Sequence, residues 1–370
     1  MSRPHNERIN PSFNSTLSCY VLSAINASGT TDAALYNAVL NNVLYTEPSL
    51  VPLTLDKSTT APYLHVELEA LQDLEVDERM LLMVDHLLKT LKANVTTITP
   101  FDHDDIKQVW VVSHLFENNV QSNKNSVRAW QQHVQSKIEE CFQQNKITIR
   151  FVSKRSFNDI FTLTEPVLLV MVDSFHSPEC VTQLKSAHKI QVVKGKTGLI
   201  VGEGAICTLL APQPLAASTS PSVSANERAL DIESFNPEQK LSLNAQLKQA
   251  KVGFNDVIVQ VGVHDETWVK HWYQQSHYLV ETNKAAQTNN NLVSEPEQPD
   301  FLSLYTPNTV VGYTGAADFF TGVYFAQAWL HFPLHQHTES TASIYVVEHS
   351  INQQHDITAS LYRVSLSANN

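Results

Sequence analysis

Continuous apolar runs alternate along the chain with segments in which apolar residues recur every three or four positions. The runs have the length and composition of buried strands, and the clearest ones lie at 19–26, 109–113, 147–152, 167–172, 204–210 and 257–263. The recurring segments predict amphipathic helices at 77–91 and 126–143, and further helices are expected at 31–42 and 237–251. An apolar helix is expected at 319–330. Two more strands are expected at 342–348 and 357–364. The alternation predicts an α/β protein with buried central strands.

The composition changes between residues 211 and 230, where Pro, Ser, Ala and Thr predominate and a surface linker is expected. On this basis we expect a flexible N-terminus over 1–17, an N-terminal half over 18–210 and a C-terminal half over 231–370. A strand followed by a helix is expected near the start of each half, at 19–42 and 257–278, which hints at two similar halves.

The composition indicates a globular protein and argues against some classes of partner. The chain has 370 residues, of which 42% are hydrophobic, enough for a substantial core. Its net charge of −12 argues against a nucleic-acid or anionic-membrane partner. Neither a membrane-spanning apolar run nor the apolar segment of a secretory signal is present in the sequence, so we expect a cytoplasmic protein.

Cysteine and glycine are used sparingly. The four cysteines, Cys19, Cys141, Cys180 and Cys207, show no Cys-x-x-Cys spacing, which predicts buried reduced thiols rather than disulfides or a zinc site. There are only ten glycines, well below the average of about 7%. Four of them fall in two short motifs, Gly202-Glu203-Gly204 and Gly312-Tyr313-Thr314-Gly315. Residues 310–311 are expected at the end of a strand, and the second motif then forms a turn into the apolar helix at 319–330. Small residues ahead of such a helix allow close backbone packing.

Four segments, taken in order, resemble the β-ketoacyl synthases of the thiolase superfamily. They are the strand 167–172 followed by Asp173-Ser174, the motif Gly202-Glu203-Gly204-Ala205, the stretch 246–257, and Val311-Gly312-Tyr313-Thr314-Gly315-Ala316-Ala317. The resemblance implies a thiolase-like fold, in which two similar halves form α/β/α/β/α layers. It also implies a two-fold homodimer that pairs through the strand at 147–152.

The same resemblance locates the catalytic positions. In that family a cysteine thiolate accepts the acyl group and two histidines assist decarboxylation of the donor. The nucleophile position carries Ser153 or, in a shifted register, Val152 or Lys154. His264 lies one place from the first histidine position, and Tyr313 stands at the second. The family's glycine-rich loop corresponds to 349–356, which has no glycine, so the resemblance implies degenerate catalytic positions.

Other catalytic or metal chemistry has weaker support. Ser153, beside Lys154 and Arg155, lacks a nucleophile elbow. His331, His335 and His337 have no evident Cys or carboxylate partner, so a solvated loop is expected and no metal. We interpret the remaining clusters as packing or charged loops: His271 with Trp268 and Trp272, and His103 with Asp102, Asp104 and Asp105. The sequence contains neither a P-loop nor a dinucleotide fingerprint, and no cofactor is expected.

Three functions follow as hypotheses, because fold alone does not choose among them. The first is a catalytically inactive, ketosynthase-like protein that binds another protein as a scaffold, adaptor or chaperone; a bacterial secretion-system effector is one such partner. The second is a chain-length-factor-like subunit that pairs with an active ketosynthase and meets its acyl carrier protein. The third is a divergent acyltransferase that uses Ser153 and His264. The first is the leading prediction, with the chain a pseudoenzyme rather than an enzyme.

Overall fold

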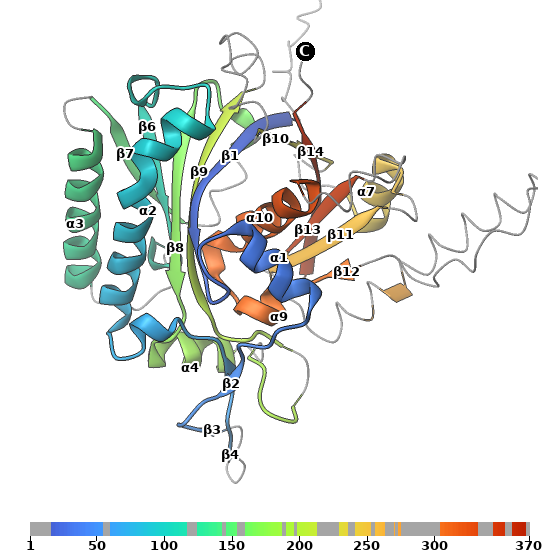
Figure 1. Cartoon of the computed structure of the whole chain (residues 1–370). Helices are drawn as coiled ribbons and strands as arrows, with labels where there is room; N and C mark the ends of the chain where they lie inside the picture. The colour runs from blue at the N-terminus through green and yellow to red at the C-terminus, as the bar shows by residue number, and fades with distance from the viewer. Residues whose placement is uncertain are drawn as a thin grey trace, which may run out of the picture.

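The computed structural model describes residues 16–54, 60–116, 124–142, 146–153, 160–186, 190–195, 198–212, 229–235, 241–252, 256–262, 270, 273–274, 304–331, 343–351 and 357–367. Within these ranges the main sheet has ten strands in the order β12-β11-β13-β14-β10-β1-β9-β8-β6-β7. Two small pairings, β2 (Glu47–Pro48) with β5 (Leu64–His65) and β3 (Leu53–Thr54) with β4 (Thr60–Ala61), form a projection at the bottom of Figure 1.

The sheet repeats one topology twice. The first five strands are β1 (Thr16–Ile25), β6 (Gln108–Val112), β7 (Thr148–Val152), β8 (Val167–Ser174) and β9 (Glu203–Pro212). The second five are β10 (Leu230–Ser234), β11 (Val257–Gly262), β12 (Leu304–Tyr305), β13 (Ile344–Ile351) and β14 (Ile357–Leu366). Each set is ordered third, second, fourth, fifth, first, and its fifth strand is antiparallel to both neighbours. The antiparallel β1–β10 pairing joins the two sets.

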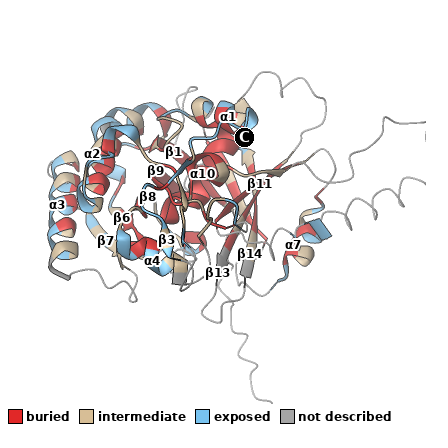
Figure 2. Cartoon of the chain, turned by 90° about the horizontal axis from the view of Figure 1, so that it is seen from below, coloured by how far each residue is buried: buried red, intermediate tan, exposed pale blue. Residues whose placement is uncertain are grey.

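Helices complete five layers. The amphipathic helices α2 (Val76–Ile98) and α3 (Lys124–Phe142) cover the outer face of the first set of strands, and α7 (Leu243–Ala250) packs on the second (Figure 1). Between the sets lie α10 (Asp318–His331) and α1 (Asp32–Leu40), and Figure 2 shows that most of α10 is buried. Thr31 caps α1, because its Oγ1 accepts from Ala34 N at 3.2 Å. The predicted thiolase-like α/β fold is confirmed.

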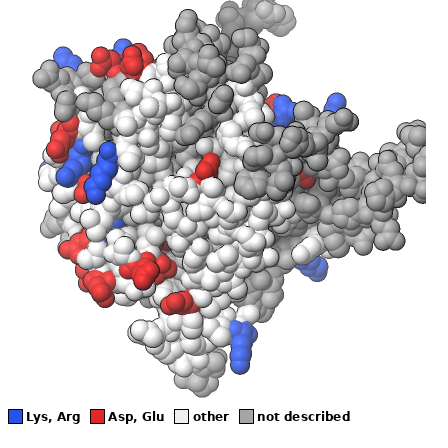
Figure 3. Space-filling model, viewed as in Figure 1, with Lys and Arg blue, Asp and Glu red and all other residues white. Residues whose placement is uncertain are grey.

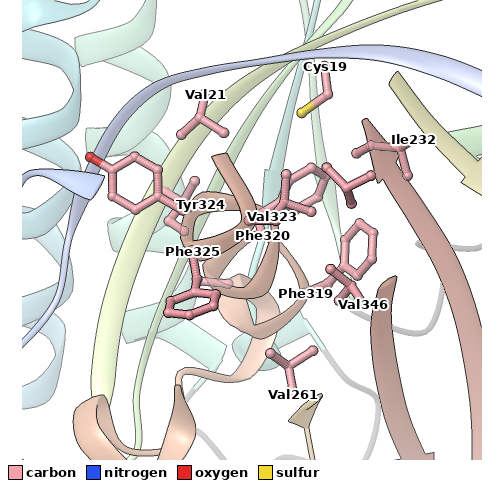
Figure 4. Close-up of a cluster of buried hydrophobic side chains, with 14 of the residues drawn as sticks. Cys19, Val21, Ile232, Val261, Phe319, Phe320, Val323, Tyr324, Phe325 and Val346 are labelled. Carbon is pink, nitrogen blue, oxygen red and sulfur yellow. The ribbon is translucent and has the colours of Figure 1, made fainter. Parts of the chain in front are cut away.

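The central layer explains why the 319–330 segment is apolar on every face. Phe319, Phe320, Val323 and Phe325 are buried, and Figure 4 shows them between Cys19, Val21 and Ile232 on one side and Val261 and Val346 on the other. A helix that contacts strands on two sides has no face left for water. Helix α10 therefore holds the two sets of strands together.

Two local expectations were wrong. Residues 310–311, expected at the end of a strand, belong to the short helix α9 (Asn308–Val311), which Gly312 ends. The second half opens on β10, which was missed, so β1 corresponds to β10 rather than to the strand at 257–263. The alternating burial of Leu230–Ser234 is the period of two typical of a strand, and it could have revealed β10.

The expected boundaries after residues 17, 210 and 230 remain predictions. Strand β1 begins at Thr16, and residues 1–15 lie outside the described ranges. Strand β9 runs to Pro212 and β10 starts at Leu230, so residues 213–228 of the expected linker are also outside them. None of the described helices is both long and apolar enough to cross a membrane.

Candidate functional site

The candidate site lies where three neighbouring parallel strands end. Strands β7, β6 and β8 run parallel, so their carboxyl ends meet at one edge of the sheet. Ser113 follows β6 and its backbone N–H donates to Val152 O at the end of β7, 3.3 Å away. Ser153, the expected nucleophile position, comes directly after Val152 and is partly exposed. Carboxyl ends of parallel strands are the usual place for a ligand site in α/β proteins.

Asp173, on β8, organises this edge. Its fully buried carboxylate accepts hydrogen bonds through Oδ1 from Ser113 Oγ (2.7 Å), His114 N (2.8 Å) and His114 Nδ1 (2.6 Å). Its Oδ2 accepts from Ala316 N at 2.6 Å. Ala316 belongs to the 3₁₀ turn η5 (Gly315–Ala317), so the carboxylate joins the end of β6 to the approach to α10. A Cβ at Gly315 would overlap Asp173 Oδ2, which explains the glycine there.

The two glycine motifs of the sequence contact each other. A Cβ built at Gly202 would lie 2.8 Å from Gly312 Cα, and one built at Gly312 would lie 2.8 Å from Gly202 Cα. Tyr313 N donates to Ile200 O at 2.8 Å across the same contact. We call this contact of 200–204 with 312–315 the glycine joint. It brings the backbone ahead of β9 against the backbone ahead of α10 with no side chain between them.

Tyr313, which the resemblance predicts at the second histidine position, is part of the packing around the joint. Its ring lies 4.9 Å from that of Phe175, centroid to centroid, in a cluster that includes Val201 and Val181. Behind it, Asp318 Oδ1 accepts from Asn308 Nδ2, Thr314 N and Thr314 Oγ1, each at 2.8 Å. These buried groups fix the turn before α10.

A thiol completes the arrangement at His114. Cys180 lies in the first turn of α4 (Pro178–Ser186), and Ser177 caps that helix by accepting from Cys180 N at 3.1 Å. Cys180 Sγ is 3.4 Å from His114 Nε2, while His114 Nδ1 faces Asp173. Phe175 stacks on the imidazole with ring centroids 4.5 Å apart. The Cys180 thiol and the Asp173 carboxylate therefore contact opposite ring nitrogens of His114.

The electrostatics favour a charged imidazole. Burial on its own lowers the pKa of His114, but the Asp173 carboxylate and hydrogen bonds to Asp173 and Cys180 outweigh it and raise the pKa to about 10. By contrast, burial raises the pKa values of the Cys19 and Cys207 thiols, which therefore remain protonated.

Cys180 and His114 line a groove of about 1050 Å³. The described lining also contains His65 and His176, and its carboxylates are Glu67, Asp73, Glu75, Asp77 and Glu179. Figure 3 shows acidic side chains gathered at the lower left, over the N-terminal end of α2. Arg79 also lines the groove, but its guanidinium forms ion pairs with Glu67 and Glu203. The groove thus presents an excess of negative charge.

Glu203, in the first glycine motif, fixes the floor of the groove. It is buried and accepts from Leu68 N at 2.9 Å and Arg79 Nη1 at 3.1 Å through Oε1, and from Ser174 Oγ at 2.9 Å through Oε2. Arg79 also donates to Leu74 O and Gln72 O. The ion pair holds the segment before α2 against β9.

The predicted site residues divide into two groups. Ser153 lies at the edge described above, while Gly202, Glu203, Gly204, Gly312, Tyr313 and Gly315 meet at the glycine joint beside it. His264, His335 and His337 lie outside the described residues. Nδ1 of His331 is 2.8 Å from Gln327 O in the preceding helical turn. Within the described ranges, no group of three or more metal-ligating side chains is found.

The sequence did not lead us to His114 or Cys180 as site residues, or to Asp173 as the hydrogen-bond acceptor for His114. His114 and Asp173 each lie at the carboxyl end of a predicted buried strand, a signal that would have paired them. No sequence signal connects Cys180 to them, since 66 residues separate it from His114.

Neither a protein-family model nor a curated protein sequence matches the chain. Solved structures do match. The ketosynthase from module 6 of the bacillaene synthase from Bacillus subtilis 168 aligns at 10% identity with a TM-score of 0.58, over 96% of this chain and 72% of that one. The PfaC keto synthase–chain length factor gives 12% identity and a TM-score of 0.53, over 95% and 43% respectively. The ishigamide ketosynthase/chain length factor gives 11% and 0.52, over 94% and 98%.

These matches confirm the resemblance at the level of the fold. The chain has the thiolase-like fold of ketosynthases and chain length factors, and the alignment covers nearly its whole length.

Proposed function

We propose that the chain is a protein-binding member of this fold that does not perform ketosynthase chemistry, and that it acts as a scaffold, adaptor or chaperone. The proposal is supported by the residues expected at the family's catalytic positions. The resemblance puts Ser153 where the family has its nucleophilic cysteine and Tyr313 where it has a catalytic histidine, and the Tyr313 ring packs on Phe175. A neutral phenol in a packed cluster cannot supply the acid–base behaviour of an imidazole.

A partner-binding surface lies beside the groove. Leu44, Leu50 and Val51 are 69%, 100% and 75% exposed, and the last two line the acidic groove. Exposed apolar residues next to a charged rim are typical of protein interaction sites. We infer that the partner presents apolar and basic side chains here.

The first test is acyl transfer at Ser153. The protein is incubated with acyl- and malonyl-loaded carrier protein, and its tryptic peptides are examined by mass spectrometry. We expect no acyl group on Ser153, because no imidazole is placed at the family's second histidine position. An acyl-Ser153 peptide that disappears in Ser153→Ala would instead support the divergent acyltransferase with Ser153 and His264.

The second test is partner binding. Tagged wild type, a Leu50→Ser/Val51→Ser double variant and a control, Leu82→Ser on the outer face of α2, are used as bait in lysate of the native host. We expect a protein recovered by wild type and control in similar amounts and at least tenfold less by the double variant. Equal recovery by all three would remove this surface from the proposal.

A chain-length-factor-like subunit is the second candidate. Its support is that several similar solved structures are ketosynthase–chain length factor assemblies. Such a subunit would pair with an active ketosynthase. Recovery of only a ketosynthase or an acyl carrier protein in the same experiment would favour it over the adaptor.

A further inference from the structure

We propose that Cys180 is a nucleophilic thiol, served by His114 and Asp173, that takes up the acyl group of an ester or amide whose neighbouring residue is positively charged. The proposal goes beyond the protein-binding function, because it assigns a covalent activity to residues outside the family's catalytic positions. It rests on three features: the alignment of the three side chains, the opening of the thiol to the groove, and the charge of that groove.

The alignment has the geometry of a nucleophile, a base and an orienting acid. Nε2 of His114 is 3.4 Å from the sulfur, and Nδ1 is 2.6 Å from Asp173 Oδ1. Asp173 is itself held by Ser113 Oγ and by Ala316 N, so the imidazole is oriented by two elements beyond its own. Phe175 fixes the ring plane by stacking. Nε2 of the protonated imidazole lies at hydrogen-bond distance from the sulfur, where it is placed to donate to a thiolate.

The position of Cys180 adds to this effect. It lies in the first turn of a nine-residue helix, where the positive end of the helix dipole favours negative charge. Cys180 and His114 are each 8% exposed, and both line the groove, so a reagent reaches the sulfur through the groove. The other buried thiols, Cys19 and Cys207, lie in β1 and β9, inside the hydrophobic clusters.

The groove defines the substrate class. Glu179 is adjacent to Cys180 in sequence, and Asp77 lies across the groove at the start of α2. Together with the other carboxylates of the lining they attract a lysine or arginine side chain and disfavour an acidic one. Leu50 and Val51 offer apolar surface to the rest of such a segment.

The reaction proceeds in two steps, acylation of the thiol and hydrolysis of the thioester, and uses only Cys180, His114 and water. The thiolate attacks the carbonyl carbon, a C–S bond forms, and the C–O or C–N bond to the leaving group breaks. The His114 imidazolium gives its proton to that leaving group and becomes neutral. Neutral His114 then removes a proton from water, the hydroxide attacks the thioester, and the C–S bond breaks to give the carboxylic acid, the thiolate and the imidazolium again.

Alkylation by iodoacetamide tests the thiol in the full-length protein. Rates at Cys180 and at Cys141, the partly exposed cysteine of α3, are followed by peptide mass spectrometry from pH 5 to pH 9. We expect Cys180 to react at least tenfold faster than Cys141 at pH 6. Equal rates at the two thiols, or a slower rate at Cys180, would overturn the proposal.

A variant assigns the effect to the imidazole. His114→Asn keeps an amide donor towards Asp173 but has nothing to offer the sulfur. We expect the pH 6 rate at Cys180 to drop at least tenfold while that of Cys141 is unchanged, which also reports that the fold is intact. An unchanged rate at Cys180 would contradict the role of His114.

Two chromogenic esters test acyl transfer and its charge preference. The p-nitrophenyl esters of N-benzoyl-arginine and N-benzoyl-glutamate differ in the charge beside the carbonyl. We expect a burst of p-nitrophenolate from the arginine ester, an acyl group mapped to Cys180, and loss of the burst in Cys180→Ser. Glu179→Gln should reduce the preference for arginine about threefold. A burst that survives Cys180→Ser, or equal rates for both esters, would refute the proposal.

Discussion

At the scale of single residues, Asp173 is held by four hydrogen bonds from two parts of the chain. It is a buried carboxylate with hydroxyl, amide and imidazole donors, and none of the partners given by the described residues is a lysine or arginine. Burying a carboxylate is costly unless charge and hydrogen bonds compensate. His114 supplies the compensating charge when it is protonated, so the two residues stabilise the fold together.

This coupling predicts a pH-dependent stability. The folded state raises the pKa of His114 from about 6.5 to about 10, so the folded chain keeps a proton that the unfolded chain releases in between. The stabilisation is complete below pH 6.5 and is lost as the pH rises to 10. In a Cys180→Ser background, where no thiol titrates beside the imidazole, we expect the free energy of unfolding to fall by about 1.4 kcal/mol per pH unit in this window relative to the same protein carrying His114→Asn. Urea unfolding at steps of half a pH unit measures the free energy of unfolding of both proteins. The same dependence of this free energy on pH in both would contradict the assignment to His114.

At the scale of elements, the glycine joint positions β9 against the approach to α10. Gly202 and Gly312 touch backbone to backbone, so nothing flexible can move aside for an added methyl group. The contact at Gly204 differs, because a Cβ there would meet the Thr314 side chain at 3.0 Å and Ile25 O at 3.2 Å. The joint thus keeps Asp173, Tyr313 and η5 in register across the two sets of strands.

The difference between these glycines is measurable. We expect Gly202→Ala to lower the free energy of unfolding by about 3 kcal/mol, since overpacking at a rigid contact moves backbone. Gly204→Ala, the matched control in the same motif, should cost about 1 kcal/mol, because the Thr314 side chain can shift. Chemical denaturation of the three proteins provides the comparison. A loss of about 1 kcal/mol or less for Gly202→Ala would show that the joint tolerates a side chain.

At the scale of the whole molecule, the sheet has an open edge at β7. Within the described residues β7 pairs only with β6, and its burial alternates between exposed and intermediate. An edge strand presents free N–H and C=O groups that a second copy can pair with. We propose that two chains associate through this edge, as the family resemblance implies for the strand at 147–152.

Light scattering after size-exclusion chromatography tests that association. We expect a mass about twice the 41.4 kDa of one chain. Thr148→Asp places charge at an exposed position of β7 and should shift the mass towards one chain, whereas Leu82→Asp on α2 should not. A single-chain mass for wild type at micromolar concentration would contradict pairing through β7.

The sequence by itself determined the layered α/β fold, because long apolar strands and an all-apolar helix can be buried only between layers. It also determined the glycine motifs, since a residue without Cβ marks a backbone contact wherever its partner lies. Tertiary structure alone decided which motifs meet: 110 positions separate Gly202 from Gly312, and no periodicity spans that distance. It likewise decided that Cys180 faces His114. A thiol acquires its chemistry from neighbours brought to it by the fold, and a linear pattern of residues does not contain that information.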